Sequence, residues 1–275
     1  MSGSVHTEGP IVLVGAGGIG APAALALAAA GVRALRVADD DRVELSNLHR
    51  QILFADADVG RLKLDAFADA LRRRFPATAI ELHHGRALPT TVAALVAGAS
   101  VVVDATDNFA SRFLLADACA LSGVPVVHAA AVRWTATVMA VSARGRPCYR
   151  CLFEDIPTDD APDCATAGVA GPVCGVAGAL AADRALRVLA GDGRAHGSIV
   201  TFDGRRDLLR SVAVRARPAC PLCGDAPALP DLDPRRYSPS CGAPQTPGPA
   251  GEPQKGRSWT ATSKSPSASR PPSAP

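Results

Sequence analysis

Four glycines near the N-terminus have the spacing of a phosphate-binding turn. Gly15, Gly17 and Gly20 form a Gly-x-Gly-x-x-Gly pattern in "VGAGGIGA", with Gly18 inside it. Backbone without Cβ atoms can approach a pyrophosphate closely, and the N-terminus of a following helix offers N–H groups and positive dipole to the anion. A tight glycine turn without a ligand is the alternative. Because an apolar run precedes the pattern and an Ala/Leu-rich run follows it, we favour a nucleotide site.

The stretch "VADDDRVELSNLHRQILF" at residues 37–54 indicates which nucleotide binds. Asp39 ends the second predicted strand, where an acid can hold the ribose hydroxyls of NAD or of ATP. Asn47 and Arg50 then add an amide and a permanent cation, and Lys63 follows in the first turn of the next predicted helix. Such cations are often only solvated charges. Two of them beside a glycine loop nevertheless favour a triphosphate over a dinucleotide.

Acidic residues also end the fourth predicted strand, in "VVVDATDNFASR". Asp104 and Asp107 lie there at the carboxyl edge, where open α/β sheets bind ligands. An acid in this place can hold Mg²⁺ against phosphate groups. The alternative is a helix N-cap, which suits Asn108 well and Asp107 about as well as metal binding does.

The elements that must position these residues alternate through the first half of the chain. Apolar runs alternate with helical stretches such as residues 20–31 and 60–75. This βαβ pattern predicts an α/β fold, a Rossmann-like sheet with helices on both faces. From about residue 133 we expect a smaller antiparallel or irregular part. It should contain one more helix at 171–191 and two late strands joined by a turn at Asp203-Gly204.

Two Cys-x-x-Cys pairs indicate metal chemistry. Cys148 with Cys151, and Cys220 with Cys223, together offer the four soft ligands of a closed tetrahedral zinc site. The long interval between the pairs means that the fold must join them. A redox or disulfide pair is the alternative. Since protein ligands fill all four positions, the zinc would be structural.

Other residues that could do chemistry are expected to pack instead. Cys119 and Cys174 fall in apolar helical patterns and are predicted core residues. His128 follows the apolar run "VPVV", and we expect it to end a strand as a packed side chain and not as a catalytic base.

Composition excludes several classes of protein. The chain has 275 residues, is 48% hydrophobic and carries a net charge of +3 from scattered basic residues, so we expect no nucleic-acid partner. The uncharged run at 165–182 contains Pro172 and many Ala and Gly, so we interpret it as a buried loop and helix and not as a membrane span. With no signal peptide at the N-terminus, a cytoplasmic protein is expected.

Three regions are predicted along the chain. Residues 1–9 form a short N-terminal segment, and residues 10–225 form the domain with the nucleotide and zinc sites. Residues 226–275 are rich in Pro, Ser and Gly and are predicted to be disordered, because they offer too little apolar surface to offset the entropy of ordering.

Seven motifs together resemble those of the MoeB/ThiF/HesA family, relatives of the ubiquitin-activating enzymes. They are "GAGGIG", "DDDRVELSNLHRQ", "GRLK", "DATDNFASR", "PCYRC", "CATAGVAGP" and "CPLC", in the family's order over about residues 10–224. The resemblance implies ATP-dependent adenylation of the C-terminal glycine of a small ubiquitin-fold sulfur-carrier protein ending in Gly-Gly, with release of pyrophosphate.

By that resemblance, individual residues take roles. Asp39 would bind the ribose, Asn47, Arg50 and Lys63 the phosphates, and Asp107 the Mg²⁺, with Gln51 and Asn108 also at the nucleotide. The four paired cysteines would bind Zn²⁺.

The resemblance also implies roles outside the nucleotide site. Cys164, in "DCATAG", would be the cysteine that forms a covalent bond with the activated carrier in some members. The resemblance further implies a homodimer. Apart from the resemblance, we expect Arg133 and Trp134 to line the groove for the carrier's tail.

The chain also departs from the family pattern. The segment before the first strand has no Arg-Tyr-x-Arg-Gln motif, and no rhodanese domain follows the second cysteine pair, so a separate sulfur donor is expected. Three alternatives stay open: a catalytically silent relative that presents a peptide, an enzyme that adenylates a short peptide in natural-product biosynthesis, and an NAD dehydrogenase. The last is disfavoured because no residue is evidently placed for hydride chemistry.

Overall fold

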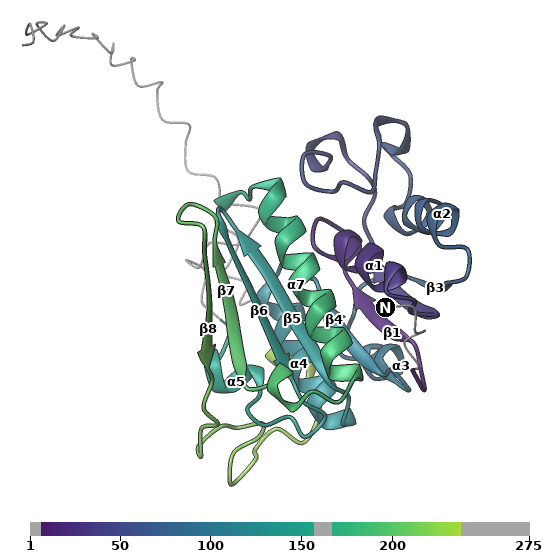
Figure 1. Ribbon diagram of the computed structural model, residues 1–275. Coiled ribbons are helices and arrows are strands. Elements are labelled where there is room, and N and C mark those ends of the chain that lie inside the picture. The colour runs from purple at the N-terminus through teal and green to yellow at the C-terminus, as the bar shows by residue number, and fades with distance from the viewer. Residues whose placement is uncertain (1–6, 157–166, 238–275) are drawn as a thin grey trace, which may run out of the picture. The chain divides into compact units, whose positions relative to one another are not determined.

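The apolar runs assemble into a sheet with the strand order β3-β2-β1-β4-β5-β6-β7-β8 (Figure 1). The computed structural model describes residues 7–156 and 167–237 of the chain. The strands are β1 (Ile11–Val14), β2 (Ala34–Asp39), β3 (Ala79–His84), β4 (Val101–Asp104), β5 (Val126–Val132), β6 (Thr135–Val141), β7 (Ser198–Asp203) and β8 (Leu208–Ala213).

Strands β3, β2, β1, β4 and β5 pair in parallel, as the βαβ pattern predicts. The chain leaves β1 toward one edge of the sheet to form β2 and β3, and then returns to the other side of β1 to form β4. The carboxyl ends of β1 and β4 therefore flank a topological switch point, where open α/β sheets bind ligands.

The predicted antiparallel part is a continuation of the same sheet. β5 and β6 form a hairpin through Arg133 and Trp134, and β6–β7 and β7–β8 also pair antiparallel. The turn predicted at Asp203-Gly204 joins β7 to β8. One prediction is wrong in detail: His128 does not end a strand but lies inside β5, which continues to Val132.

The helices cover both faces of the sheet (Figure 1). They are α1 (Gly20–Ala29), α2 (Lys63–Arg74), α3 (Val92–Val96), α4 (Phe109–Ser122), α5 (Tyr149–Leu152) and α7 (Gly171–Leu189). Alternate residues of β1 serve different cores: Ile11 and Leu13 pack with α1, α2 and α7, whereas Val12 and Val14 pack with α3 and α4. Both faces of β1 are therefore buried, which explains why all of its residues are apolar.

Helix α7 lies in the core and takes up most of the uncharged run. It packs against α1 so closely that a Cβ on Gly178 would lie 2.5 Å from the carbonyl oxygen of Ile19. Among the described residues no helix is long and apolar enough to cross a membrane.

The ordered chain continues past the predicted boundary at residue 226. Leu229 and Leu232 pack against the second core, and Tyr237 is buried at its edge with its hydroxyl donating to Asp117 at 2.7 Å. These three side chains attach residues 226–237 to the core, although the composition of this segment resembles that of a linker. Residues 238–275, including Cys241, lie outside the described part.

Candidate nucleotide site and four-cysteine centre

A cleft of ≈ 270 Å³ opens at the carboxyl ends of β1, β2 and β4. Ten of the predicted nucleotide residues line it: Gly15, Gly17, Gly18, Asp39, Asn47, Arg50, Gln51, Lys63, Asp107 and Asn108. They come from separate loops that only the parallel sheet brings together. Gly20, the remaining predicted residue, does not line the cleft and instead starts α1 behind it.

The glycine loop is shaped by close approaches of backbone to backbone. Gly15 has a φ of 97°, in the left-handed region, and a Cβ there would lie 2.7 Å from the carbonyl oxygen of Ala105. A Cβ on Gly20 would lie 1.8 Å from the carbonyl oxygen of Gly15. The glycines therefore determine the path of the chain from β1 into α1, and they also provide space for phosphate groups.

Asp39 ties the end of β2 to the glycine loop. Its carboxylate accepts from the backbone N–H of Ala16 at 2.7 Å and from that of Asp41 at 2.9 Å. Burial raises the pKa of Asp39, while the Ala16 N–H and the charge of Lys63 partly offset this rise. A carboxylate has about four acceptor positions, so two backbone bonds leave it able to accept from ribose hydroxyls.

The loop that carries Arg50 is clamped between the glycine loop and α7. A Cβ on Gly18 would lie 3.2 Å from the carbonyl oxygen of Arg50, and a Cβ on Gly171 would lie 2.3 Å from that of His49. Within this loop the Asn47 Oδ1 accepts from Arg50 Nη2 at 2.8 Å and from Gln51 Nε2 at 3.2 Å. The buried amide of Asn47 thus holds the guanidinium at the cleft.

Lys63 is the first residue of α2, as predicted, and is almost completely buried. Its side chain is 7% exposed, and its Nζ lies 2.6 Å from Asp41 Oδ2. An ammonium this enclosed has lost most of its water, so Asp41 compensates its charge in the absence of a nucleotide. The prediction that Lys63 reaches the cleft agrees with this geometry, whereas the alternative of a solvated charge does not.

The end of β4 separates two acids that look alike in the sequence. Asp104 is fully buried outside the cleft, and its Oδ2 lies 2.7 Å from His128 Nδ1. Burial tends to raise the pKa of Asp104, but Arg112 and His128 hold it below its ordinary value. Asn108 caps α4 by accepting from Ser111 N–H at 2.9 Å. Asp107 therefore does not act as the cap, and it is one of the residues that line the cleft.

Several cleft residues were not predicted to lie at the nucleotide site. They are Asp40, Asp41, Arg86, Thr106, Ser111 and Cys174. Asp41 stands beside Asp39 in "DDDR", and Arg86 follows the third predicted strand, so a search of every strand end for charged residues would have found both. Cys174 is buried in α7, as predicted for a core residue, but it also lies against Gly18.

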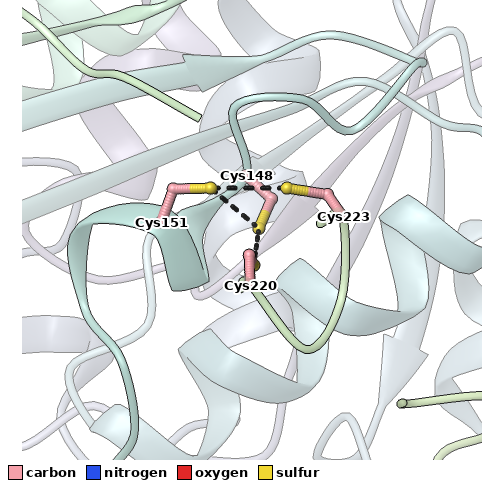
Figure 2. Close-up of side chains that lie close together, drawn as sticks. All are labelled: Cys148, Cys151, Cys220 and Cys223. Atoms are coloured by element: carbon pink, nitrogen blue, oxygen red, sulfur yellow. Dashed lines mark hydrogen bonds between the residues drawn. The ribbon is translucent and has the colours of Figure 1, made fainter. Parts of the chain in front are cut away.

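The two cysteine pairs meet, as the zinc prediction requires (Figure 2). Their four sulfurs all lie within 4.8 Å of one another, with Cys148 Sγ 3.9 Å from Cys151 Sγ and 3.5 Å from Cys220 Sγ. Cys151 Sγ and Cys223 Sγ are 3.3 Å apart. Sulfurs at ~2.3 Å from a tetrahedral zinc lie roughly 3.8 Å apart, so the four residues fit the metal. Burial also raises the pKa of Cys148, so a cation is needed to hold its thiolate.

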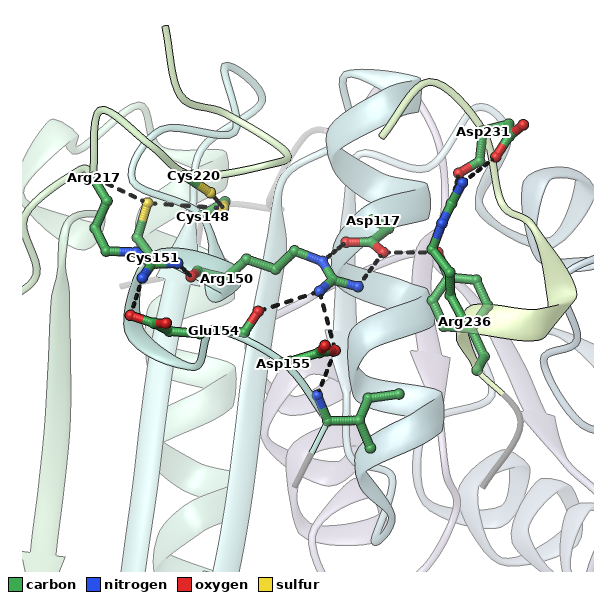
Figure 3. A network of polar contacts seen from close by, with 12 residues as sticks. Asp117, Cys148, Arg150, Cys151, Glu154, Asp155, Arg217, Cys220, Asp231 and Arg236 are labelled. Atoms are coloured by element: carbon green, nitrogen blue, oxygen red, sulfur yellow. Dashed lines mark hydrogen bonds and ion pairs between the residues drawn. The ribbon is translucent and has the colours of Figure 1, made fainter. Parts of the chain in front are cut away.

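A buried ion pair anchors the cysteine turn to α4 (Figure 3). Arg150, between the first two cysteines, donates to Asp117 through Nε at 2.8 Å and Nη2 at 2.9 Å, and Tyr237 donates to the same carboxylate. Arg217 donates its backbone N–H to Cys151 Sγ at 3.4 Å and its Nη2 to the carbonyl oxygen of Arg150 at 3.0 Å. The centre is therefore joined to the core by charged hydrogen bonds.

Four further residues were singled out from the sequence. Cys164 lies outside the described residues, so its covalent role stays a prediction. Cys119 is buried in α4, where burial raises the pKa of its thiol, in agreement with a core role. Arg133 and Trp134 are exposed at the tip of the β5–β6 hairpin, and their contact with a carrier stays a prediction.

Comparison with known proteins shows the family. The ThiF family pattern matches residues 7–222. The SAMP-activating enzyme E1 of Haloferax volcanii is 41% identical over 235 residues, which are 84% of this chain and 86% of that protein. The sulfur carrier protein adenylyltransferase of Thermus thermophilus is 39% identical over 81% of this chain and 84% of its own length.

Two other comparisons bear on length and fold. The adenylyltransferase and sulfurtransferase MOCS3 of Sus scrofa is 40% identical over 86% of this chain, but the chain spans only 52% of that protein. The crystal structure of E. coli MccB superposes with a TM-score of 0.70 and 22% identity over 80% of this chain and 66% of that chain, which shows a shared fold. The chain belongs to the ThiF family and is an adenylyltransferase of its E1-like type.

Proposed function

We propose that the protein uses ATP to adenylate the C-terminal glycine carboxylate of a small ubiquitin-fold sulfur carrier that ends in Gly-Gly. The observation that carries this proposal is that Arg50, Lys63 and Asp107 line one cleft with the glycine loop. The names of the relatives from Haloferax volcanii and Thermus thermophilus support the choice of substrate class. Adenylation would prepare the carrier for sulfur transfer.

The reaction would join the carrier to AMP. A carboxylate oxygen of the carrier attacks the α-phosphorus of ATP, the bond from that phosphorus to the bridging oxygen breaks, and pyrophosphate leaves. Negative charge grows on the leaving pyrophosphate, so fixed cations that face it stabilise the transition state more than the ground state. Arg50 and Lys63, which line the cleft, would do this, while Asp39 would hold the ribose and the glycine loop the phosphate oxygens.

Asp107 would hold Mg²⁺. When bound, this ion neutralises and orients the phosphate groups. The residue type suits a hard cation, because carboxylate oxygens are its preferred protein ligands and Asp107 lines the cleft. In the structure the Lys63 ammonium forms an ion pair with Asp41. For Lys63 to bind a phosphate, this contact would have to be exchanged for one with a phosphate oxygen when the nucleotide enters.

The four cysteines would hold a structural Zn²⁺ away from this reaction. None of them lines the nucleotide cleft, and four thiolates leave a zinc ion without an open position for a substrate. We also propose that the enzyme is a cytoplasmic homodimer that obtains sulfur from a separate donor protein.

The product identifies the reaction. The zinc-loaded protein is incubated with Mg·ATP and a ubiquitin-fold carrier ending in Gly-Gly, and the carrier is analysed by mass spectrometry. We expect a carrier–AMP adduct together with released pyrophosphate. A carrier whose last glycine is deleted serves as the control and should form no adduct. ADP and phosphate as products, or NADH binding without adduct, would contradict the proposal.

A further inference from the structure

The turn that carries Asp107 is held by a buried polar network behind the nucleotide cleft. At the end of β4, Asp104 Oδ1 accepts from the backbone N–H of Thr106 at 3.0 Å and from the Thr106 hydroxyl at 2.7 Å. The other oxygen, Oδ2, lies 2.7 Å from His128 Nδ1 of β5. The carbonyl oxygen of Thr106 accepts from Arg112 of α4. Every polar group of Thr106 is therefore bonded, and the peptide units on both sides of this residue are fixed.

The backbone is also fixed on either side of this turn. Before it, Ala105 donates its N–H to the carbonyl oxygen of Val14 at 2.9 Å, which joins the turn to β1. After it, Asn108 caps α4. Asp107 stands between these fixed residues, and in the described part of the chain its carboxylate has no hydrogen bond or ion pair. A carboxylate on a fixed turn, without a partner of its own there, is suited to bind a cation.

Stability alone does not explain why charged residues hold this turn. The side chains of Asp104, Arg112 and His128 are all buried. Removing charges from water is costly, and well-packed apolar residues of similar volume often give equal or greater stability. The alternative is that the network only joins β4 to β5 and α4. Its bonds to Thr106, one residue before the predicted metal ligand, favour a role in the site instead.

Thr106 lines the cleft, but its hydroxyl proton is used by Asp104. A hydroxyl has one donor, and phosphate oxygens need donors. The Thr106 side chain is therefore placed to hold the turn and not to bind a phosphate group itself.

We propose that Thr106 is a positioning residue for the metal ligand of the nucleotide site. Through its bonds to Asp104 and Arg112 it fixes the turn, so that the Asp107 carboxylate meets the cation of Mg·ATP with little loss of conformational freedom. A ligand group that is ordered in advance binds more tightly than one that must become ordered on binding. This inference rests on the proposed function, which places Mg²⁺ at Asp107.

Three variants separate positioning from a general structural role. Thr106→Val removes the hydroxyl and keeps the branched shape, and Thr106→Ser restores the hydroxyl. Thr78→Val is the matched control, because Thr78 is also buried and donates its hydroxyl to the carbonyl oxygen of Val32 at 2.9 Å, outside the cleft. Thermal unfolding verifies that each variant is folded. If Thr106→Val is not folded, Thr106→Ala, which also lacks the hydroxyl, takes its place.

The readout is the dissociation constant of ATP, measured by calorimetry on the full-length, zinc-loaded protein with Mg²⁺ and in buffer freed of Mg²⁺. One lost hydrogen bond corresponds to about a 3–10-fold change in affinity. We expect Thr106→Val to bind Mg·ATP more weakly by this factor and to bind metal-free ATP as wild type does. Thr106→Ser and Thr78→Val should match wild type in both conditions. An equal loss with and without Mg²⁺, a similar loss in Thr78→Val, no loss, or no binding of Mg·ATP by wild type would overturn the inference.

A double-mutant cycle shows whether the Thr106 hydroxyl acts through Asp107. In the Asp107→Ala background the metal ligand is absent, so Thr106→Val should cause no further change in the affinity for Mg·ATP. A further loss of about 3–10-fold in that background would mean that Thr106 acts on the nucleotide by another route, and the positioning role would be refuted.

ATP–pyrophosphate exchange distinguishes this inference from the proposed function. If exchange requires the carrier and Thr106→Val needs no more Mg²⁺ than wild type, the proposed function stands and the role of Thr106 is refuted. If no carrier supports exchange but Thr106 and Asp107 are coupled in Mg·ATP binding, the positioning role stands and the proposed activity is wrong. We expect the Mg²⁺ concentration for half-maximal exchange to rise about 3–10-fold in Thr106→Val, with a KM for the carrier equal to that of wild type.

Discussion

At the scale of single residues, the nucleotide site is held ready by contacts that a ligand would replace or extend. Lys63 faces Asp41, and Arg50 is held by the amide of Asn47. Both cations are therefore held in place without a nucleotide, so the proposed binding of ATP would require little side-chain ordering. Preorganised charge of this kind contributes more to catalysis than flexible surface charge does.

The first prediction concerns these two cations. Lys63→Ala and Arg50→Ala should each lower kcat for carrier adenylation by about 10²–10³-fold, because each removes one preorganised donor from the reacting phosphates. Arg61→Ala is the control, since Arg61 lies near Lys63 in sequence but pairs with Asp58 and Asp69 outside the cleft. Rates near wild type in both cleft variants would refute the assignment.

The second prediction concerns pH and Asp104. Its folded-state pKa is lower than the ordinary 3.8, so the unfolded state binds the proton more tightly than the folded state does. The ionised carboxylate therefore stabilises the fold fully above that ordinary pKa, and this contribution is lost as the pH falls through 3.8 toward the folded value. Urea unfolding of wild type and Asp104→Asn from pH 7 down to pH 3 should show a difference in free energy that shrinks with acid. A difference that is constant or grows on acidification would contradict this account.

At the scale of elements, the glycine loop and the loops after β2, β3 and β4 make the site by meeting at one edge of the sheet. The geometry depends on backbone contacts that leave no room for a side chain, as at Gly20, where a Cβ would lie 1.8 Å from a carbonyl oxygen. The position of α1, and through it of the whole loop, rests on such contacts.

The third prediction tests this dependence. Gly20→Ala must move the backbone of the glycine loop, so it should destabilise the fold by about 1–3 kcal/mol and weaken ATP binding. Gly175→Ala in α7 is the matched control: a Cβ there meets nothing within 4 Å, and alanine is the better helix former. We expect this control to equal or exceed wild type in thermal unfolding. Equal stability of both variants would show that the loop tolerates a side chain.

Sequence reasoning succeeded where the signal is local and failed where it depends on tertiary register. The order of strands and helices, the glycine loop, Lys63 at the start of α2 and the two cysteine pairs each follow from spacing within a short stretch. The pairing of Asp104 with His128 arises because β4 and β5 lie side by side in one register, which no local pattern encodes. The burial of Tyr237 likewise depends on Asp117, far away in the sequence.

At the scale of the whole described chain, the cysteine centre and the segment around Tyr237 are both joined to helix α4. Arg150 and Tyr237 both bond to Asp117 of α4, so segments distant in sequence are joined at one buried carboxylate (Figure 3). The nucleotide cleft lies outside this network, and none of these three residues lines it. This stabilising network is therefore separate from the residues that line the cleft.

The fourth prediction follows from this separation. The protein should bind one Zn²⁺ per chain, and Cys223→Ser or a strong chelator should lower the melting temperature by removing a bond between distant segments. Mg²⁺ or Ca²⁺ should not restore it, because thiolates prefer softer metals. Metal analysis combined with calorimetry decides the matter. The assignment would be contradicted if the protein retained no zinc after incubation with Zn²⁺. It would also be contradicted if removal of the zinc left the melting temperature unchanged.

The central claim is that this cleft activates a carboxylate with ATP. ATP–pyrophosphate exchange, measured with and without a ubiquitin-fold carrier ending in Gly-Gly, tests it most directly. We predict exchange that requires the carrier and Mg²⁺, persists in Arg61→Ala and falls by about 10²-fold or more in Lys63→Ala. Folded, zinc-loaded protein that catalyses no exchange with any such carrier, or that exchanges equally well without Lys63, would contradict the account.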